Sequence, residues 1–279
     1  MKHSKRVDER RFRGAKEIQT DPFIFRWTVN SAGYEWLDGE DGKLRLYPVH
    51  APGVGAWNYT PEPGLYREFA ALSPTRDAIR EFAGKYGDLF DLWPIAYVPA
   101  RSGRMVGGTS LDRWNAKIED MRTVVTLWDQ IQDERRHAEL KKIIVRTDKE
   151  IRYVRGRTDV PLTRTGELSR FNPKDVVLPA RCALQWEVNK RLSDTDTPTI
   201  IVPRLTLTPD FHQRIIFQPS NLLAEMWMRF AQTIAGDFQL KQCANLGCPH
   251  YFQVGPGGKR QDTETCSDRC RKEKSRNAK

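Results

Sequence analysis

The sequence has no long apolar run. No stretch among its 279 residues approaches the roughly 20 consecutive apolar residues that a helix needs to cross a bilayer, so we expect no membrane-spanning helix. The segment from Lys2 to Arg13 is charged and no apolar segment follows it, which argues against a secretory signal peptide. These absences, together with an odd number of cysteines, predict a protein of the reducing cytoplasm.

Recognisable catalytic motifs are also missing. The sequence contains no phosphate-binding loop, dinucleotide fingerprint, nucleophile elbow or HExxH motif. Adjacent acids such as Glu40-Asp41 and Glu119-Asp120 face different ways on regular structure, so they do not define a site. The five histidines are scattered along the chain: His3, His50, His137, His212 and His250. We therefore expect no enzyme, although a metal nuclease built from distant carboxylates stays open.

Cysteine is scarce, and four of the five cysteines lie in the last forty residues. They form two close pairs with seventeen residues between the pairs: Cys243 and Cys248, then Cys266 and Cys270. This spacing is typical of a closed zinc site in which four thiolates bind one Zn²⁺ tetrahedrally. Disulfides are disfavoured because Cys182 would be left over, and the usual ferredoxin spacings of an iron–sulfur protein are absent. Redox-active cysteines and an iron–sulfur cluster stay open as alternatives.

The residues around these cysteines predict a knuckle, a hairpin and a helix. Gly247 suits the tight turn of the first knuckle because glycine accepts a positive φ. The stretch 251–254 reads as a short strand, and the glycine-rich stretch 255–258 reverses the chain. A helix starting at Cys266 would place Cys270 on the same side, four residues later. His250 is a further candidate ligand, but four thiolates already fill the site, so we expect it to lie outside the ligand shell.

This pattern resembles the CGNR-type zinc finger, which ends a group of bacterial proteins regarded as transcription regulators. The resemblance rests on Cys243 to Cys248, Tyr251-Phe252, Arg260 and Cys266-Ser267 with the basic stretch that follows, and it covers only about the last forty residues. Cys270 is followed by Arg-Lys-Glu instead of Gly-Asn-Arg. The resemblance implies a treble-clef-like finger and a bacterial DNA-binding protein.

The net charge of +10 is concentrated at the two ends. Residues 1–16 and residues 269–279 each carry an excess of five positive charges, while the remaining bases and acids cancel. Concentrated positive charge favours a polyanion partner such as nucleic acid, although basic tails also serve simply to keep a protein soluble. The candidate phosphate contacts are Lys259, Arg260, Arg269, Arg271, Lys272, Lys274 and Arg276.

The rest of the chain predicts an α+β fold. We expect residues 1–20 to be a flexible basic tail, residues 21–236 a mixed α/β body, and residues 237–279 the finger. The body should contain helices at 65–72, at 73–87 with Ser73 as cap, over about 30 residues from Ser110, at 178–192, and at 220–236 with Ser220 as cap. Short antiparallel strands are expected at 23–29, 34–37, 44–47, 143–145, 151–154, 199–202, 205–207 and 215–217.

Three segments read as loops, namely 48–64, 99–108 and 158–174. The spacing of the aromatic residues from Tyr66 to Phe90 indicates core packing, and Cys182 reads as an inert core thiol. The connection between the last body helix and Cys243 is short, so the finger should be docked on the body.

These features support three hypotheses. The first is a zinc-containing nucleic-acid-binding protein, in the manner of a transcription regulator. The second is an interaction or ligand-sensing module in which the zinc is structural and the body binds a protein, a small ligand or a second copy of the chain. The third, an enzyme with the finger as an accessory, has the least support in the sequence.

Overall fold

The computed structural model describes residues 27–39, 41–49, 56–59, 61–62, 64–90, 108–163, 166–193, 201–207, 213–236, 239–248, 250–255 and 258–277. Several expected features lie outside these residues. They are the basic tail 1–20, the start of the first strand at 23–26, residues 99–107 of the loop expected at 99–108, and residues 199–200 of the strand expected at 199–202. Within the described residues the α+β fold is confirmed, with seven helices and small antiparallel sheets.

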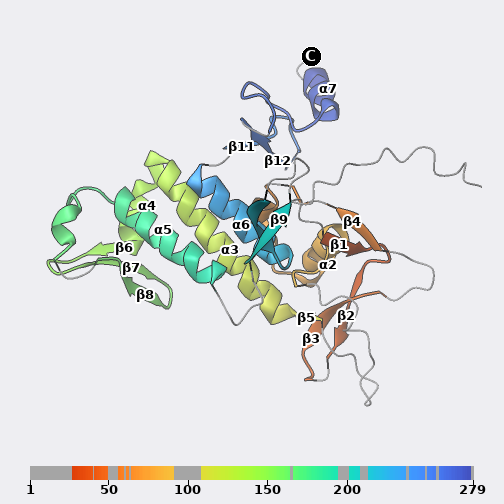
Figure 1. Cartoon of the computed structure of the whole chain (residues 1–279), viewed down its shortest axis with the longest axis horizontal. Coiled ribbons are helices and arrows are strands. Elements are labelled where there is room, and N and C mark those ends of the chain that lie inside the picture. The colour runs from red at the N-terminus through yellow and green to blue at the C-terminus, as the bar shows by residue number, and fades with distance from the viewer. Residues whose placement is uncertain are drawn as a thin grey trace, which may run out of the picture.

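Helices form the centre of the body (Figure 1). The longest, α3 (Leu111–Gln132), packs against α1 (Leu65–Ala71), α4 (His137–Ile143) and α5 (Val177–Leu192). α6 (Leu222–Ala235) packs in turn against α1 and α5, and α2 (Arg76–Tyr86) lies against the first strands. These contacts enclose one continuous hydrophobic core.

The apolar patterns of the sequence explain this core. On α3 the side chains of Trp114, Ile118 and Met121 recur at helical spacing and are fully buried. The aromatic residues of α1 and α2 interlock with this stripe, since the ring centroids of Phe69 and Phe82 lie 5.5 Å apart and that of Phe69 lies 6.2 Å from Trp114. The prediction that these aromatics pack in the core is confirmed.

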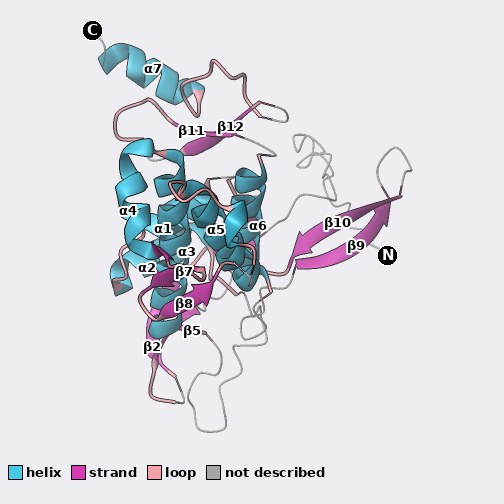
Figure 2. Cartoon of the chain, turned by 90° about the vertical axis from the view of Figure 1, so that its left-hand side faces the viewer, coloured by secondary structure: helices cyan, strands magenta, loops and turns pink. Residues whose placement is uncertain are grey.

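The strands form five small antiparallel sheets within the described chain. Two have three strands: β2 (Tyr34–Asp38) with β3 (Leu44–Pro48) and β5 (Thr109–Ser110), and β6 (Ile144–Arg146) with β7 (Ile151–Arg155) and β8 (Thr158–Pro161). Three have two strands: β1 (Trp27–Asn30) with β4 (Ala56–Tyr59), β9 (Ile201–Leu207) with β10 (Gln213–Pro219), and β11 (Gln239–Gln242) with β12 (Tyr251–Val254). The β9–β10 ribbon projects away from the helices (Figure 2).

Some helix boundaries differ from the sequence predictions. The expected cap Ser110 does accept a hydrogen bond from the Arg113 N–H. However, α2 is capped by Thr75 instead of Ser73, and α6 by Asn221 instead of Ser220. α3 has 22 residues, fewer than the expected 30, because Asp133 leaves helical geometry and starts a 3₁₀ turn.

Two expected loops contain strands. Segment 48–64 includes β4, which pairs with β1, and segment 158–174 includes β8, which pairs with β7. The expectation that Cys182 is a core thiol is also wrong. Cys182 is half-buried on α5, beside the exposed Leu178, because the buried stripe of that helix runs instead through Ala180, Ala183 and Leu184.

No helix in the described part of the chain is long and apolar enough to span a bilayer.

Candidate metal centre

The finger lies above the helices, with β11 and β12 between the body and α7 (Asp268–Asn277), which forms its outer end (Figures 1 and 2). Cys243 directly follows β11, and Cys248 ends the loop before β12. Cys266 comes just before α7, and Cys270 lies in its first turn. The strand predicted at 251–254 and a helix that carries Cys270 are both present, but the helix begins at Asp268 instead of Cys266. The predicted order is wrong in one respect: β12 pairs with β11, which precedes the knuckle, so the knuckle joins the two strands of the hairpin instead of preceding it.

The first knuckle is shaped by its backbone. Gly247 has a φ of 83°, as its turn requires, and the Cys248 N–H donates to the Asn245 carbonyl over 3.0 Å. The Cys243 N–H donates to the His250 carbonyl over 2.9 Å and closes the loop. The side-chain amide of Asn245 then donates to Glu273 on α7 over 3.0 Å, so the knuckle and the helix are held face to face.

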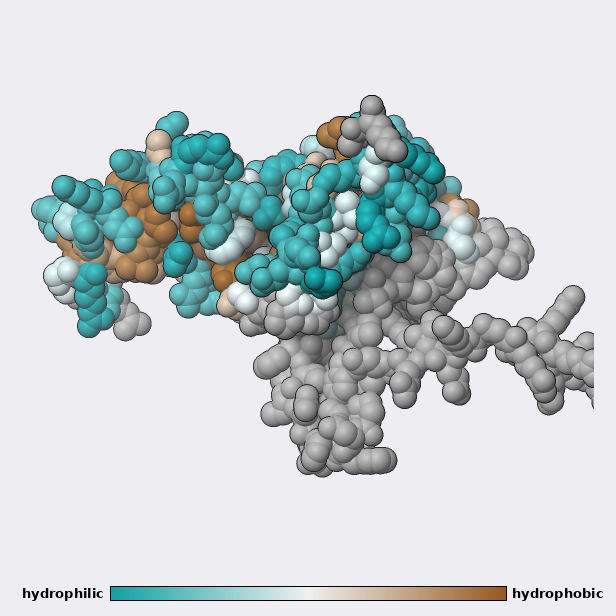
Figure 3. Space-filling model, turned by 90° about the horizontal axis from the view of Figure 1, so that it is seen from above, coloured by the Kyte–Doolittle hydropathy of each residue, from teal (hydrophilic) through white to brown (hydrophobic). Residues whose placement is uncertain are grey.

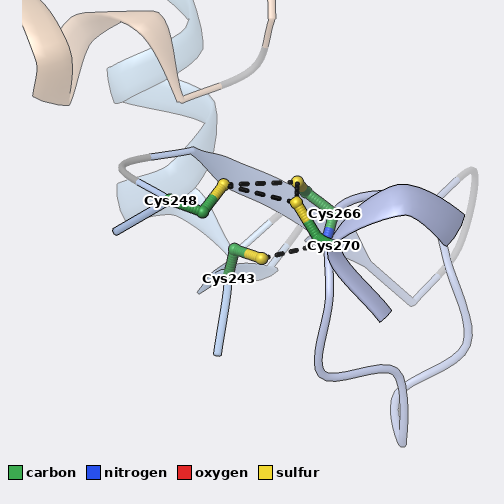
Figure 4. Close-up of side chains that lie close together, drawn as sticks. All are labelled: Cys243, Cys248, Cys266 and Cys270. Carbon is green, nitrogen blue, oxygen red and sulfur yellow. Dashed lines mark hydrogen bonds between the residues drawn. The ribbon is translucent and has the colours of Figure 1, made fainter. Parts of the chain in front are cut away.

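The four sulfurs converge on one point (Figure 4). The Sγ atoms of Cys248, Cys266 and Cys270 are separated by 3.5 to 3.7 Å, and all four sulfurs lie within 4.8 Å of one another. Four thiolates bound to Zn²⁺ at about 2.3 Å in a tetrahedron lie about 3.8 Å apart. Disulfide sulfurs would be about 2.05 Å apart, and all four cysteines are free. The cage fits a single tetrahedral ion.

The hydrogen bonds around the cage also suit thiolate ligands. The Cys266 N–H donates to the Cys243 sulfur over 3.4 Å, and the Cys270 N–H donates to the Ser267 hydroxyl over 3.2 Å. Donors aimed at a metal-bound sulfur or at its neighbours orient the ligands and stabilise their negative charge. A multi-iron cluster, whose thiolates bind different irons, would need a wider cage.

The thiols differ in acidity. Burial raises the pKa of Cys248 and that of Cys266, so both hold their protons at neutral pH without a metal. The Ser267 hydroxyl, followed by the neighbouring thiols, lowers the pKa of Cys270 to about 7. Soft thiolates select zinc or iron, and four of them this close could hold one metal ion such as zinc.

No protein-family model, curated protein or solved structure matches this chain. What is established about the finger is therefore its buried four-cysteine cluster.

His250 does not join the cysteine ligands. Its imidazole points to the body, where Nδ1 lies 3.2 Å from a carboxylate oxygen of Glu68 and 3.3 Å from one of Glu62. Neighbouring contacts dock the finger on α1, because the Arg67 guanidinium lies 5.2 Å from the centre of the Tyr251 ring. Leu240 packs against the body core. The finger is docked, as its short connection predicted.

The seven basic candidates do not form one uniform group. Four of them pair with acids of the finger itself: Arg260 with Asp262, Arg269 with Glu273, Arg271 with Asp268, and Lys274 with Glu264. Within the described residues, Lys259, Lys272 and Arg276 are exposed and have no ion pair, although the Lys259 ammonium lies 5.7 Å from the centre of the Phe252 ring.

Sequence reasoning missed these pairs. Two of them could have been read from helical spacing, since Asp268 and Arg271 are three residues apart and Arg269 and Glu273 are four apart. The pair Arg260–Asp262 lies within the loop before α7, and the pair Lys274–Glu264 joins α7 to that loop. Neither pair had such a signal in the sequence.

Proposed function

We propose that this protein binds nucleic acid through a finger that one zinc ion holds in shape. The observation that carries the proposal is the cage of four sulfurs, whose size suits Zn²⁺ and whose last member lies in the first turn of the basic helix α7. An ion bound there fixes α7 on the hairpin. The CGNR-like residues and the position of α7 at the outer end of the finger support a role in contacting DNA.

Lys259, Lys272 and Arg276 are the leading phosphate contacts of this proposal. Each of these side chains can contact a phosphate without first breaking an ion pair. Lys272 and Arg276 are four residues apart and share one face of α7. The finger side of the molecule is also largely hydrophilic, while apolar groups gather on the helical part beside it (Figure 3). Phosphate contacts of this kind supply affinity and not base specificity.

The test is a salt titration of DNA binding by the full chain, comparing the wild type with the triple variant K259A/K272A/R276A. For duplex DNA, each phosphate contact contributes about 0.9 to the steepness of log affinity against log salt concentration. The plot for the triple variant should therefore be shallower than that of the wild type by about 2 to 3. Its affinity at low salt should fall as well. The control K141A/K142A/K149A removes the same charge from exposed body positions and should bind like the wild type.

A second function, protein recognition, has its own supporting observation. Leu246, at the tip of the first knuckle, is 85% exposed, more than any other exposed large apolar side chain of the described residues, and it would be the apolar contact of a protein partner. In that case the finger would be a docked platform whose zinc is structural. An unchanged slope and affinity in K259A/K272A/R276A would exclude the phosphate interface and leave this second function standing.

A further inference from the structure

A second group of metal-binding side chains lies where the finger meets the body. Glu62 precedes α1, Glu68 lies within α1, and His250 belongs to the finger, between Cys248 and β12. One ligand atom of each lies within 4.8 Å of the others. These residues are far apart in the sequence and come together only because the finger is docked.

The contacts of His250 are not those of an ordinary ion pair. Its Nδ1 atom is shielded from solvent and lies 3.2 and 3.3 Å from the two carboxylates, yet it makes no aligned hydrogen bond among the described residues. A buried polar atom without a hydrogen bond is costly, and an ion bound at that place is one of the arrangements that would satisfy it. The nitrogen and both carboxylates lie around one shared space.

The separations suit a first-row divalent metal. Ligand nitrogens and oxygens about 2.1 Å from one ion lie about 3.0 Å apart at adjacent octahedral positions and about 3.4 Å apart in a tetrahedron. The observed 3.2 and 3.3 Å fall between these values. The second oxygen of Glu68 accepts a hydrogen bond of 2.5 Å from the Tyr86 hydroxyl, as the supporting partner of a metal-bound carboxylate does.

We propose that Glu62, Glu68 and His250 bind a second divalent transition-metal ion, separate from the one in the four-cysteine cage. Imidazole and carboxylate ligands suit zinc, manganese or cobalt, and three protein ligands leave positions for water or for a group of a partner. Because two ligands come from the body and one from the finger, the ion fastens the finger to α1. This inference does not depend on nucleic-acid binding.

The test uses the full chain loaded with one equivalent of Zn²⁺ and titrated with Co²⁺. A second equivalent should bind and give the weak d–d absorption of an oxygen and nitrogen site, without the intense thiolate-to-cobalt band. H250A and E62Q should weaken this binding at least about tenfold. The control H137A removes an imidazole of the body that contacts only a backbone carbonyl among the described residues, and it should bind cobalt like the wild type.

E62Q keeps the test valid if H250A disturbs the nearby knuckle, because the Glu62 side chain is 58% exposed and lies outside the finger. Both variants should still hold one zinc. Three results would each overturn the proposal. They are saturation at one metal ion per chain, cobalt affinity that is unchanged in E62Q, and cobalt binding that always brings the thiolate-to-cobalt band.

Discussion

At the scale of single residues, one side chain of α7, that of Glu273, connects two parts of the finger. Glu273 accepts from Asn245 of the knuckle with one oxygen and from Arg269 of its own helix with the other, over 2.9 Å. It therefore sets the distance between the two cysteine pairs. The sequence predicted the four sulfurs through their spacing, but the roles of Glu273 and Asn245 depend on how the knuckle meets α7, which no local pattern encodes.

The acidity of the thiols predicts how zinc affinity changes with pH. Zinc binds thiolates, so every proton held by a thiol in the metal-free protein must leave. Cys248 and Cys266, whose pKa values burial raises, keep their protons through the neutral range, and the affinity should therefore rise with pH there. Below about pH 7 the Cys270 thiol is also protonated, so zinc must displace one more proton when it binds. The slope of log zinc affinity against pH should therefore be steeper by about one below pH 7 than above it.

Competition with a chromophoric chelator at several pH values measures this slope. A slope that stays constant across the pKa of Cys270 would contradict the assignment of that thiol as the most acidic.

At the scale of elements, the contact between α1 and β12 depends on a residue without a side chain. A Cβ atom on Gly64, just before α1, would lie 2.4 Å from Cβ of Tyr251, the first residue of β12. Real Cβ atoms do not approach so closely, so only glycine lets the hairpin reach this helix. The φ of Gly64 is −92°, which any residue can adopt, and the requirement is therefore one of space alone.

The substitution G64A should push the finger away from α1. Overpacking at a close contact costs about 1–3 kcal/mol, so the urea midpoint should fall and amide exchange should rise in β12. The control is G84A: this glycine lies exposed in α2, and nothing lies within 4 Å of an added Cβ. Alanine favours the helix there, so G84A should be neutral or stabilise by up to about 1 kcal/mol. Equal effects of the two substitutions would refute the docking role of Gly64.

Most elements were predictable where their own residues carry the signal. The apolar stripe of α3, the hairpin of β2 and β3, and the left-handed Gly236 that ends α6 all follow from local patterns. β4 and β8 were missed for opposite reasons. β4 lies in a stretch rich in proline and glycine and is a strand only because β1 pairs with it, while β8 is short and polar and is defined by β7.

At the scale of the whole molecule, two hydrophobic cores differ greatly in size. The body core runs through α1 to α6, whereas the buried core of the finger consists of Cys243, Phe252, Val254 and Cys270. Two of these four are sulfur ligands. A core so small does not offset the entropy of folding a segment of this length, so we expect the finger to need a bound metal ion and the body to fold without one.

Removal of the metal with a strong chelator should therefore unfold one part only. Hydrogen exchange measured by mass spectrometry should show protection lost across 239–277 and kept in α3. The variant C266S should behave like the chelated protein, whereas C182S, which alters the cysteine outside the cage, should keep both zinc and protection. Loss of protection in α3 together with the finger would mean that the two cores are one folding unit.

The docking of β12 on α1 also bears on the order in which the chain folds during synthesis. Gly64 and Arg67 leave the ribosome long before Tyr251 and His250 exist. The surface of α1 that contacts β12 must therefore stay uncovered while the preceding helices assemble, until the strand that covers it has been made. A nascent chain that stalls before residue 250 would expose that surface to any chaperone within reach.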